Sequence, residues 1–351
     1  MNSLSPSYLR KLPVTMSLLQ SVSRLEYARG QQDLFRTQAP ELLKQLQTIA
    51  TIESTESSTR LEGATAPRQR IEALVLKNPE PQNRSESEIA GYRDALRMIH
   101  EHALHMRISE NIVKQVHQML YRYLPQPGGH YKGTQNDIVE KNAKGDIVRV
   151  RFRPTSPVQT PGAMLELVDN YRQAAEAGEV QPLFLVALAV LDFLCIHPFA
   201  DGNGRTARLL TLLLLYHHGF EVGRYISLER VIEESRDTYY EALEASSQGW
   251  HEGEHDPMPW LDYFLGIMTR AHHEFAERVT LVRGVHGTKT DMVRLAVARR
   301  LAPFQISDIE RELPNVSRDH IRNVLGTLRE EGRLRLEGSG RGSRYVPVQT
   351  E

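Results

Sequence analysis

A glycine-containing loop at residues 197–208 carries the densest group of side chains that could do chemistry. Gly202 and Gly204 permit backbone conformations that turn successive N–H groups toward one point, and a helix that follows would add the positive end of its dipole. Arg205 and Arg208 are three positions apart, so both guanidinium groups can reach the same side of that helix. The pattern predicts a binding site for a polyphosphate.

Two further residues of the loop could supply catalytic groups. Asp201 offers a carboxylate oxygen, and Mg²⁺ commonly binds one or two carboxylates together with phosphate oxygens of a substrate. The ordinary pKa of a histidine, about 6.5, suits His197 to act as a general base near neutral pH. A base, a metal ligand and an anion site together indicate phosphoryl or nucleotidyl transfer. The pattern G-x-x-x-x-G-K-[ST] is absent from the sequence, so the phosphate site is not a P-loop.

The loop matches H-x-F-x-[D/E]-G-N-G-R-x-x-R at every specified position, and the region therefore resembles the Fic family. The resemblance implies a helical Fic core over about residues 85–278 that transfers AMP from ATP to a hydroxyl group of a target protein and releases pyrophosphate. It implies that His197 deprotonates the hydroxyl group and that Asp201 binds Mg²⁺. The phosphate-binding residues that the motif implies are Gly202, Asn203, Gly204, Arg205 and Arg208.

The resemblance also extends beyond these positions. A hairpin over about residues 135–154 is similar in position to the Fic flap, which pairs with an extended segment of the target and holds its acceptor side chain over the α-phosphate. Tyr239 and Tyr240 resemble a tyrosine pair that lies near the nucleotide base in the family, although such a pair taken alone more often packs between helices. The resemblance further implies that Phe199 packs inward and anchors the loop.

Residues 58–63 fit the shorter pattern [S/T]-x-x-x-E-[G/N] of the Fic inhibitory helix. The pattern is loose, and its position upstream of a complete Fic motif gives it weight. By resemblance, Ser58, Glu62 and Gly63 form an inhibitory motif in which Glu62 pairs with Arg208 and keeps the outer phosphate of ATP from its productive place. The alternative is that Glu62 is an ordinary surface or capping residue of a helix.

Three functions fit these residues. The first is Mg²⁺-dependent transfer of AMP from ATP to a Tyr, Thr or Ser hydroxyl group of a target protein or of the chain itself. The second is the reverse reaction, in which Glu62 positions a water molecule that removes AMP. The third is a regulator of transcription whose Fic core senses a nucleotide.

The composition is that of an ordinary globular protein. Of 351 residues, 40% are hydrophobic and 25% are charged, which is enough apolar material for two or three domains. The net charge of −1 gives the whole chain no electrostatic reason to bind nucleic acid or membranes. Cys195 is the only cysteine, which excludes an intrachain disulfide and favours a reducing compartment.

We expect a cytoplasmic protein. Residues 1–13 lack the apolar core of a signal peptide. The most apolar run, residues 183–196, is shorter than the roughly 20 residues that span a bilayer. Membrane partners are therefore not expected.

Helical periodicity dominates the segments that must position the loop, so we predict a mainly α fold. Ser85 and Glu88 form a capping-box pattern at the start of one helix, which continues to about Ile99. Further helices are predicted over residues 112–120, 162–177, 183–196, 206–217, 231–246 and 258–278. Alternating apolar residues on the two sides of a turn at residues 142–145 predict the hairpin.

Composition changes toward the C-terminus. Residues 289–351 hold 12 Lys and Arg against 9 Asp and Glu, a net charge of +3. We predict an N-terminal helical region with the inhibitory motif at 1–84, a Fic catalytic core at 85–284, and a module at 289–351 after a glycine-containing linker. Helices over 292–301, 306–313 and 317–330 followed by two short strands make this module similar to a winged helix-turn-helix.

The C-terminal module could bind DNA or another protein, and the two alternatives stand equal. Its third helix presents polar side chains able to contact phosphates or base edges, namely Arg318, His320, Arg322 and Asn323. Arg341 lies in the turn that follows. A charge of +3 is small for a DNA-binding module, because phosphate contacts usually dominate affinity. Whether the chain forms a homodimer is also open.

Two other patterns are not expected to carry a function. His251 and His255 fit H-E-x-x-H, but the glycines and proline around them break the helix that such a zinc site requires. Cys195 lies two positions before His197 and is expected to be a buried apolar residue rather than a nucleophile.

Overall fold

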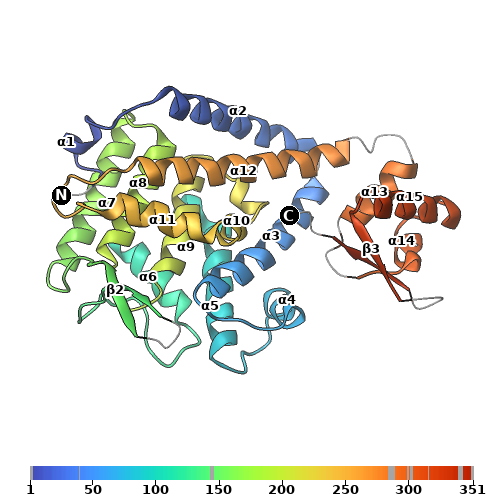
Figure 1. The fold of residues 1–351 in the computed structure, drawn as a ribbon, viewed down its shortest axis with the longest axis horizontal. Coiled ribbons are helices and arrows are strands. Elements are labelled where there is room, and N and C mark those ends of the chain that lie inside the picture. The colour runs from blue at the N-terminus through green and yellow to red at the C-terminus, as the bar shows by residue number, and fades with distance from the viewer. Residues whose placement is uncertain are drawn as a thin grey trace. The chain divides into compact units, whose positions relative to one another are not determined.

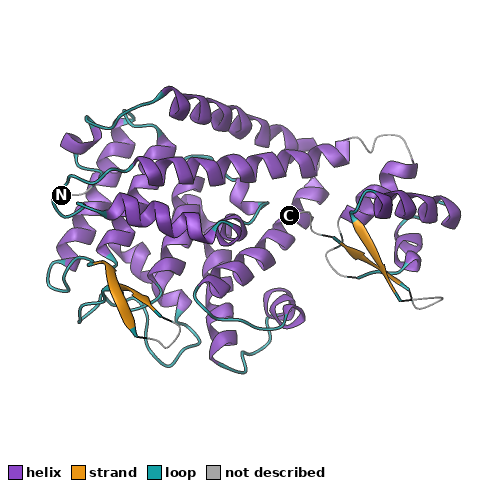
Figure 2. Cartoon of the chain, in the orientation of Figure 1, coloured by secondary structure: helices purple, strands orange, loops and turns teal. Residues whose placement is uncertain are grey.

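The computed structural model describes residues 3–38, 40–142, 146–283, 289–298, 300, 303–314, 316–338 and 343–348. Contacts divide the chain into two compact units, Met1–Phe275 and Ala276–Glu351. Helices dominate the described residues, and the strands form two small antiparallel sheets (Figure 1, Figure 2). No helix in the described ranges combines the length and apolar character that a membrane span requires. The linker predicted at 284–288 lies outside the described residues.

The part of the chain up to Arg283 is mainly α, as the periodicity predicts. Short 3₁₀ turns lie at Ala103–His105 and Val222–Arg224. The α-helices are α1 (Pro6–Leu9), α2 (Met16–Gln38), α3 (Pro40–Leu61), α4 (Arg68–Lys77), α5 (Arg84–His102), α6 (Glu110–Leu120), α7 (Thr160–Ala177), α8 (Pro182–Ile196), α9 (Asn203–His217), α10 (Leu228–Glu234), α11 (Arg236–Ser247) and α12 (Met258–Arg283).

Helix α8 is the centre of the core. Every residue from Leu183 to Ile196 is buried, which confirms the prediction of a helix without a polar face. It packs against α7 and α9, so both ends of the loop at 197–202 are attached to rigid helices. Helix α9 begins at Asn203 rather than at the predicted Thr206, because the Thr206 N–H already donates to the Gly202 carbonyl oxygen at 3.0 Å.

The capping prediction for α5 was wrong by two residues. Asn83 is the N-cap, and its side chain accepts a hydrogen bond from the Glu86 N–H at 3.0 Å. Asn and Ser are equally good caps, so the pattern alone could not choose between Asn83 and Ser85. Glu88 is therefore free of a capping role, and its carboxylate binds Arg205 at 2.7 Å.

The predicted hairpin is present. Strands β1 (Ile138–Lys141) and β2 (Ile147–Phe152) pair antiparallel, with Glu140 opposite Arg149. The register is irregular at both ends of β1. Strand β2 contacts α11, where Arg149 pairs with Glu244 at 2.8 Å (Figure 1). The single helix predicted over 231–246 is two helices, α10 and α11, because Ser235 leaves helical geometry with φ −116° and ψ 33°.

Residues 3–84 pack in the same unit as the core. Helix α3 lies against α5 and α10, and most of its second half is buried. Its contacts to α10 are polar and specific, since Ser54 Oγ donates to Glu229 at 2.7 Å and Arg60 pairs with Glu233 at 2.5 Å. The segment that carries the inhibitory motif is thus the end of a firmly attached helix.

The second unit contains the elements that the sequence predicts in the expected order. These are α13 (Lys289–Ala298), α14 (Ile306–Glu312), α15 (Arg318–Glu330), β3 (Leu334–Glu337) and β4 (Arg344–Pro347). Strands β3 and β4 pair antiparallel, and Phe304 bridges to Tyr345 through two backbone hydrogen bonds of 2.9 and 2.8 Å. The assignment of residues 289–351 as a winged helix-turn-helix stays a prediction.

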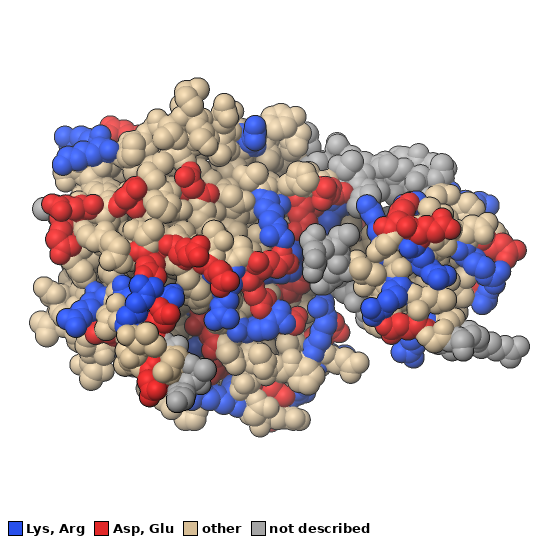
Figure 3. Space-filling view, in the orientation of Figure 1, with Lys and Arg blue, Asp and Glu red and all other residues tan. Residues whose placement is uncertain are grey.

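Charges on α15 are partly neutralised by neighbouring acids. Arg318 pairs with Glu310 at 2.9 Å, and Arg322 pairs with Asp319 at 3.1 Å. Figure 3 shows Lys and Arg interspersed with Asp and Glu on the visible face of this unit. Such pairing reduces the positive charge available to phosphates. Arg341 lies outside the described residues, and the choice between DNA and protein as partner stays open.

The position of the α5 cap is testable by a pair of substitutions. Asn83→Ala should lower the free energy of unfolding by about 1 kcal/mol, because one N–H of the first turn loses its partner. Ser85→Ala is the matched control and should change it by less than about 0.5 kcal/mol. Urea unfolding followed by circular dichroism measures both. A larger loss for the Ser85 variant would contradict the assignment.

Candidate active site

The loop begins with a sharp reversal at His197. Its N–H makes the last bond of α8, to the Phe193 carbonyl oxygen at 2.9 Å, and its backbone is left-handed with φ 50° and ψ 60°. A non-glycine residue in this region is uncommon and is found most often at turns and functional sites. The conformation ends the buried helix and places the imidazole on the wall of a cavity.

The imidazole of His197 is prepared to accept a proton. Its Nδ1 lies 3.2 Å from the Leu194 carbonyl oxygen, which can only accept, so Nδ1 carries the hydrogen and Nε2 is unprotonated. Burial lowers the pKa of His197 to about 4. The pKa value of about 6.5 expected from the sequence is thus too high, because burial removes water from the ring. The neutral ring is therefore the dominant form at pH 7.

The N-terminus of α9 faces the same cavity. Gly202, with φ 78°, is its N-cap, and the first N–H groups of an α-helix have no partner within the helix. Helix α9 has 15 residues, so its dipole favours an anion at this end. At Gly204 a Cβ would collide with the Glu62 carboxylate, which shows how closely an acidic group already approaches this N-terminus.

Arg208 is buried and bonded to Ser58 and Glu62 of the predicted inhibitory motif. Its Nη2 donates to Glu62 Oε1 at 2.7 Å and to the Ser58 carbonyl oxygen at 2.9 Å, while its Nε donates to Ser58 Oγ at 2.8 Å. Although burial disfavours its charge, the Glu62 carboxylate holds the pKa of Arg208 above its ordinary value. Gly63, with φ 86°, forms the turn that follows. The predicted contact between Glu62 and Arg208 is thus present.

Arg205 does not share the position of Arg208. It is 2% exposed, its Nη1 donates to Glu88 at 2.7 Å, and it is absent from the residues that line the cavity. A buried carboxylate without a cation would be costly, so Glu88 holds this guanidinium against α5. The expectation that both arginines reach one side is therefore corrected, and only Arg208 borders the cavity.

Asn203 closes the loop with its side chain. Its Oδ1 accepts from the Phe199 N–H at 2.9 Å, and its Nδ2 donates to the Phe199 carbonyl oxygen at 2.8 Å. Phe199 is fully buried, as the resemblance implies. Asn203 borders the cavity, but its amide group is occupied by the loop backbone rather than open to a phosphate.

Asp201 presents the carboxylate that a metal would need. Its side chain is 63% exposed, and its Oδ1 accepts from the Gly202 N–H at 2.7 Å. The described residues contain no group of three or more His, Cys, Asp or Glu that could hold a metal ion. One hard oxygen ligand with open space beside it fits Mg²⁺ completed by phosphate oxygens and water, and does not fit structural zinc.

The cavity has a volume of about 360 Å³, within the range of small-molecule sites. Its walls come from the loop, the hairpin, α8 and α11. Tyr239 is buried edge-on against Tyr240 with 5.1 Å between ring centroids and also contacts Trp260, so it packs between helices and borders the cavity at once. The predicted residues brought together there are Glu62, His197, Asp201, Gly202, Asn203, Gly204, Arg208, Tyr239 and Tyr240.

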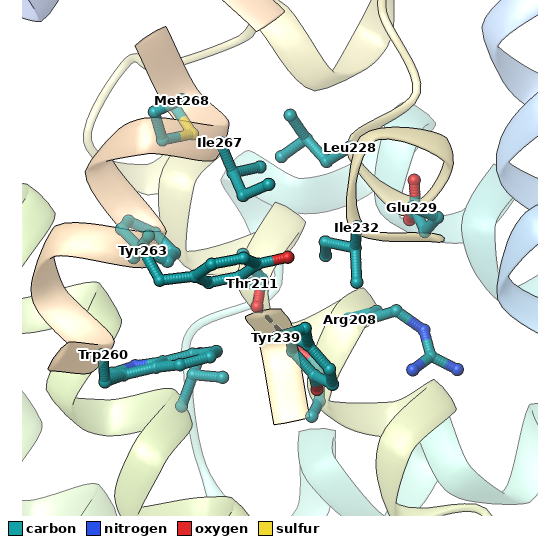
Figure 4. Close-up of a pocket in the computed structure, with 13 residues that line it drawn as sticks. Arg208, Thr211, Leu228, Glu229, Ile232, Tyr239, Trp260, Tyr263, Ile267 and Met268 are labelled. Carbon is teal, nitrogen blue, oxygen red and sulfur yellow. Dashed lines mark hydrogen bonds between the residues drawn. The ribbon is translucent and has the colours of Figure 1, made fainter. Parts of the chain in front are cut away.

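A second, much smaller cavity lies behind this wall. Arg208 and Tyr239 border it, together with mainly apolar side chains such as Ile232, Ile267 and Met268 (Figure 4). Its volume of about 30 Å³ is enough for little more than a water molecule. The larger cavity is therefore the candidate site.

Sequence reasoning missed three residues that hold the loop. Asn136 donates to the Phe199 carbonyl oxygen at 2.7 Å, and the ammonium group of Lys132 donates to the Ile196 carbonyl oxygen at 3.1 Å. Burial lowers the pKa of Lys132 to about 8. His117 stacks on Phe199. His117 lies in α6, and Lys132 and Asn136 lie in the segment between α6 and β1, where no motif marks them.

The patterns set aside occupy structural positions. Cys195 is 2% exposed, and burial raises the pKa of its thiol, which disfavours the reactive thiolate. Residues 251–255 form a turn, and His255 is buried with its Nε2 2.8 Å from Ser3 Oγ.

Fold and site together define a helical domain organised around a glycine-containing turn with a neutral histidine at its start. Residues 107–215 match the model of the Fic/DOC family, so this part of the chain is similar to that family.

Known proteins are similar to parts of the chain. The chain is 28% identical over 170 residues to protein adenylyltransferase fic-1 of Caenorhabditis elegans, and this alignment covers 47% of the chain and 30% of the relative. It is 33% identical over 90 residues to a Fido domain-containing protein of Dictyostelium discoideum, which covers 26% of the chain and 59% of the relative. The chain thus spans less than two thirds of the length of either relative.

Solved structures share the fold. A Fic family protein from Desulfovibrio desulfuricans superposes with a TM-score of 0.60 at 19% identity, covering 97% of this chain and 98% of that one. Fic-1 of Caenorhabditis elegans superposes with a TM-score of 0.59 at 21% identity, covering 75% and 73%. At these identities the likeness establishes the fold alone.

The state of the His197 ring can be measured directly. Because burial lowers its pKa to about 4, the ring should stay neutral from pH 8 down to about pH 5 and take up a proton only below that. NMR spectra of histidine-labelled chain, with the His197 signal assigned by its loss in His197→Asn, give the titration curve. A midpoint near the ordinary 6.5 would contradict the buried, neutral ring.

Proposed function

We propose that the chain is a Fic-type protein adenylyltransferase that transfers AMP from ATP to a hydroxyl group of a target protein. One observation carries the proposal: His197, whose Nε2 is unprotonated, borders the same cavity as Arg208 and the first residues of α9. A base, an anion site and a cation in one cavity suit attack on a phosphate. The names of relatives described as protein adenylyltransferases support the same activity.

The proposed reaction uses these groups in turn. His197 Nε2 takes the proton of a Tyr, Thr or Ser hydroxyl group, and that oxygen attacks the α-phosphorus of ATP. The new O–P bond forms as the bond to the β-phosphate oxygen breaks, and pyrophosphate leaves. The N–H groups at the start of α9 and the Arg208 guanidinium would stabilise the added negative charge. The acceptor hydroxyl group belongs to another protein or to the chain itself.

Mg²⁺ would bind the Asp201 carboxylate, because this side chain is exposed and carboxylate oxygen is a ligand that Mg²⁺ prefers. When bound with the nucleotide it would supply positive charge to the phosphates. The role of the protein is to hold that carboxylate at the mouth of the cavity beside His197.

Strand β2 is suited to receive the target. At one end of the strand the Ile147 and Val148 side chains are 62% and 61% exposed, and at the other end Phe152 lines the cavity. An extended target segment that pairs with this hairpin would be carried toward His197 by backbone hydrogen bonds, with little demand on its sequence.

We further propose that Glu62 inhibits the reaction by occupying Arg208. The carboxylate takes the Nη2 donor and lies against Gly204 at the start of α9, where an outer phosphate would bind. A polyphosphate carries more charge and more acceptors, so it can replace the carboxylate without leaving the buried guanidinium unpaired.

One alternative function is favoured by the position of Glu62. Glu62 borders the same cavity as His197, so its carboxylate could instead orient a water molecule for removal of AMP from a modified protein. DNA binding through residues 289–351, a nucleotide-sensing regulatory role and a homodimer stay predictions.

Release of the inhibitory contact should raise transfer. Glu62→Gly is expected to increase incorporation of labelled AMP several-fold or more, because Arg208 becomes available to phosphate. Glu56→Gln is the control, since Glu56 lies on α3, just before Glu62 in the chain, and pairs with Arg60 at 3.0 Å rather than with Arg208. Equal incorporation by wild type and Glu62→Gly would argue against inhibition, and faster loss of AMP from a modified target in wild type would favour the reverse reaction.

Loss of the base should nearly abolish transfer. In the Glu62→Gly chain, His197→Ala is expected to lower the rate by about 10² to 10⁴, the usual contribution of a general base. His102→Ala, an exposed histidine on α5, is the control. Mass spectrometry of the products identifies the added group and the acceptor residue. A rate within about twofold of the parent would remove His197 from the mechanism.

A further inference from the structure

His117 lies beneath the catalytic loop without belonging to it. It sits on α6 and is 4% exposed. Its ring is parallel to that of Phe199, with 3.7 Å between centroids and 8° between planes. The Fic motif assigns no role to this position, yet the ring is in direct contact with the loop that carries His197 and Asp201.

Two hydrogen bonds fix the tautomer of this ring. The Gly129 N–H donates to Nδ1 at 2.8 Å, so Nδ1 is the acceptor and the hydrogen is on Nε2. Nε2 lies 3.0 Å from the carbonyl oxygen of Asp201 and donates to it. The orientation of the ring is thus determined on one side by the Gly129 backbone and on the other by the Asp201 backbone.

This contact holds the backbone of Asp201, whose side chain is 63% exposed. The carboxylate itself accepts from the Gly202 N–H at Oδ1, lies 3.7 Å from Arg205 at Oδ2, and interacts with the Tyr121 hydroxyl group. The ring also packs tightly beneath Gly202, where a Cβ would lie 3.3 Å from His117 Nε2 and 3.1 Å from the Tyr121 ring. Both side chains pack against Gly202, and His117 also donates to the Asp201 backbone.

We propose that His117 is a positioning residue for the Asp201 carboxylate, and through it for the divalent cation that accompanies the nucleotide. The inference rests on the proposed function of the cavity. Residues that orient a metal ligand typically change metal affinity roughly 10- to 100-fold when removed, although they never touch the metal.

Two substitutions separate the hydrogen bond to Asp201 from simple packing. In His117→Gln the amide nitrogen can reach the place of Nε2 and donate to the Asp201 carbonyl oxygen. In His117→Asn the shorter amide can take the place of Nδ1 and accept from Gly129, but it cannot reach Asp201. The variants have the same chemical group and differ in which ring nitrogen they replace. His272→Asn, a histidine of α12 that is 5% exposed and outside the cavity lining, is the control.

The full chain with Glu62→Gly is the parent for the test, so that Arg208 is free. Isothermal titration with ADP, with and without Mg²⁺, gives the gain in nucleotide affinity that Mg²⁺ provides. We expect His117→Asn to reduce this gain roughly tenfold or more while affinity without Mg²⁺ is unchanged, and His117→Gln and the control to keep most of it. Initial rates at varied Mg²⁺ should show the same loss as a raised KM for Mg²⁺.

An unchanged Mg²⁺-dependent gain in His117→Asn would overturn the inference, and so would equal losses in the Asn and Gln variants, which would indicate a packing role. Thermal unfolding of each variant shows that the compared chains are folded. Failure of the proposed function is distinguishable, since in that case the Glu62→Gly parent itself would transfer no AMP to any protein.

Discussion

The site depends on a backbone turn that is held by hydrogen bonds to its carbonyl groups. Lys132, Asn136, His117 and Asn203 each direct a side-chain donor to a carbonyl oxygen between Ile196 and Asp201. A buried carbonyl without a partner would be costly, so these donors make one loop conformation far more stable than its alternatives. The position of His197 in a left-handed conformation follows from this, because both neighbouring carbonyls are fixed.

The two arginines of the motif pair with different carboxylates, so one has a structural role and the other borders the site. Glu88 of α5 neutralises Arg205 inside the protein, which attaches the start of α9 to the bundle. Arg208, one turn further, meets the more exposed carboxylate of Glu62, which directly follows α3. Glu62 and Arg208 border the cavity and Arg205 does not, so the second pair is the one placed to exchange its partner for a ligand.

The sequence predicts most elements of this fold because their signals are local. The apolar run of α8, the alternation in β2 and the motif itself depend on neighbouring residues. What it could not predict are the contacts that join distant segments, such as Lys132 to Ile196 or Glu88 to Arg205. The lowered pKa of His197 belongs to this class, since it results from the burial of a ring that lies next to a glycine-rich turn in the sequence. A single sequence contains no information about which partner buries which group.

If Glu62 inhibits as proposed, the inhibitory carboxylate and the Arg208 that it occupies belong to the same chain. Its effective local concentration is then determined by the geometry of α3, and dilution of the protein does not lower it. A free ligand must compete against that constant value, so its occupancy reports its own abundance and is independent of how much of the protein a cell makes. The firm attachment of α3 through Ser54 and Arg60 keeps that threshold the same in every copy.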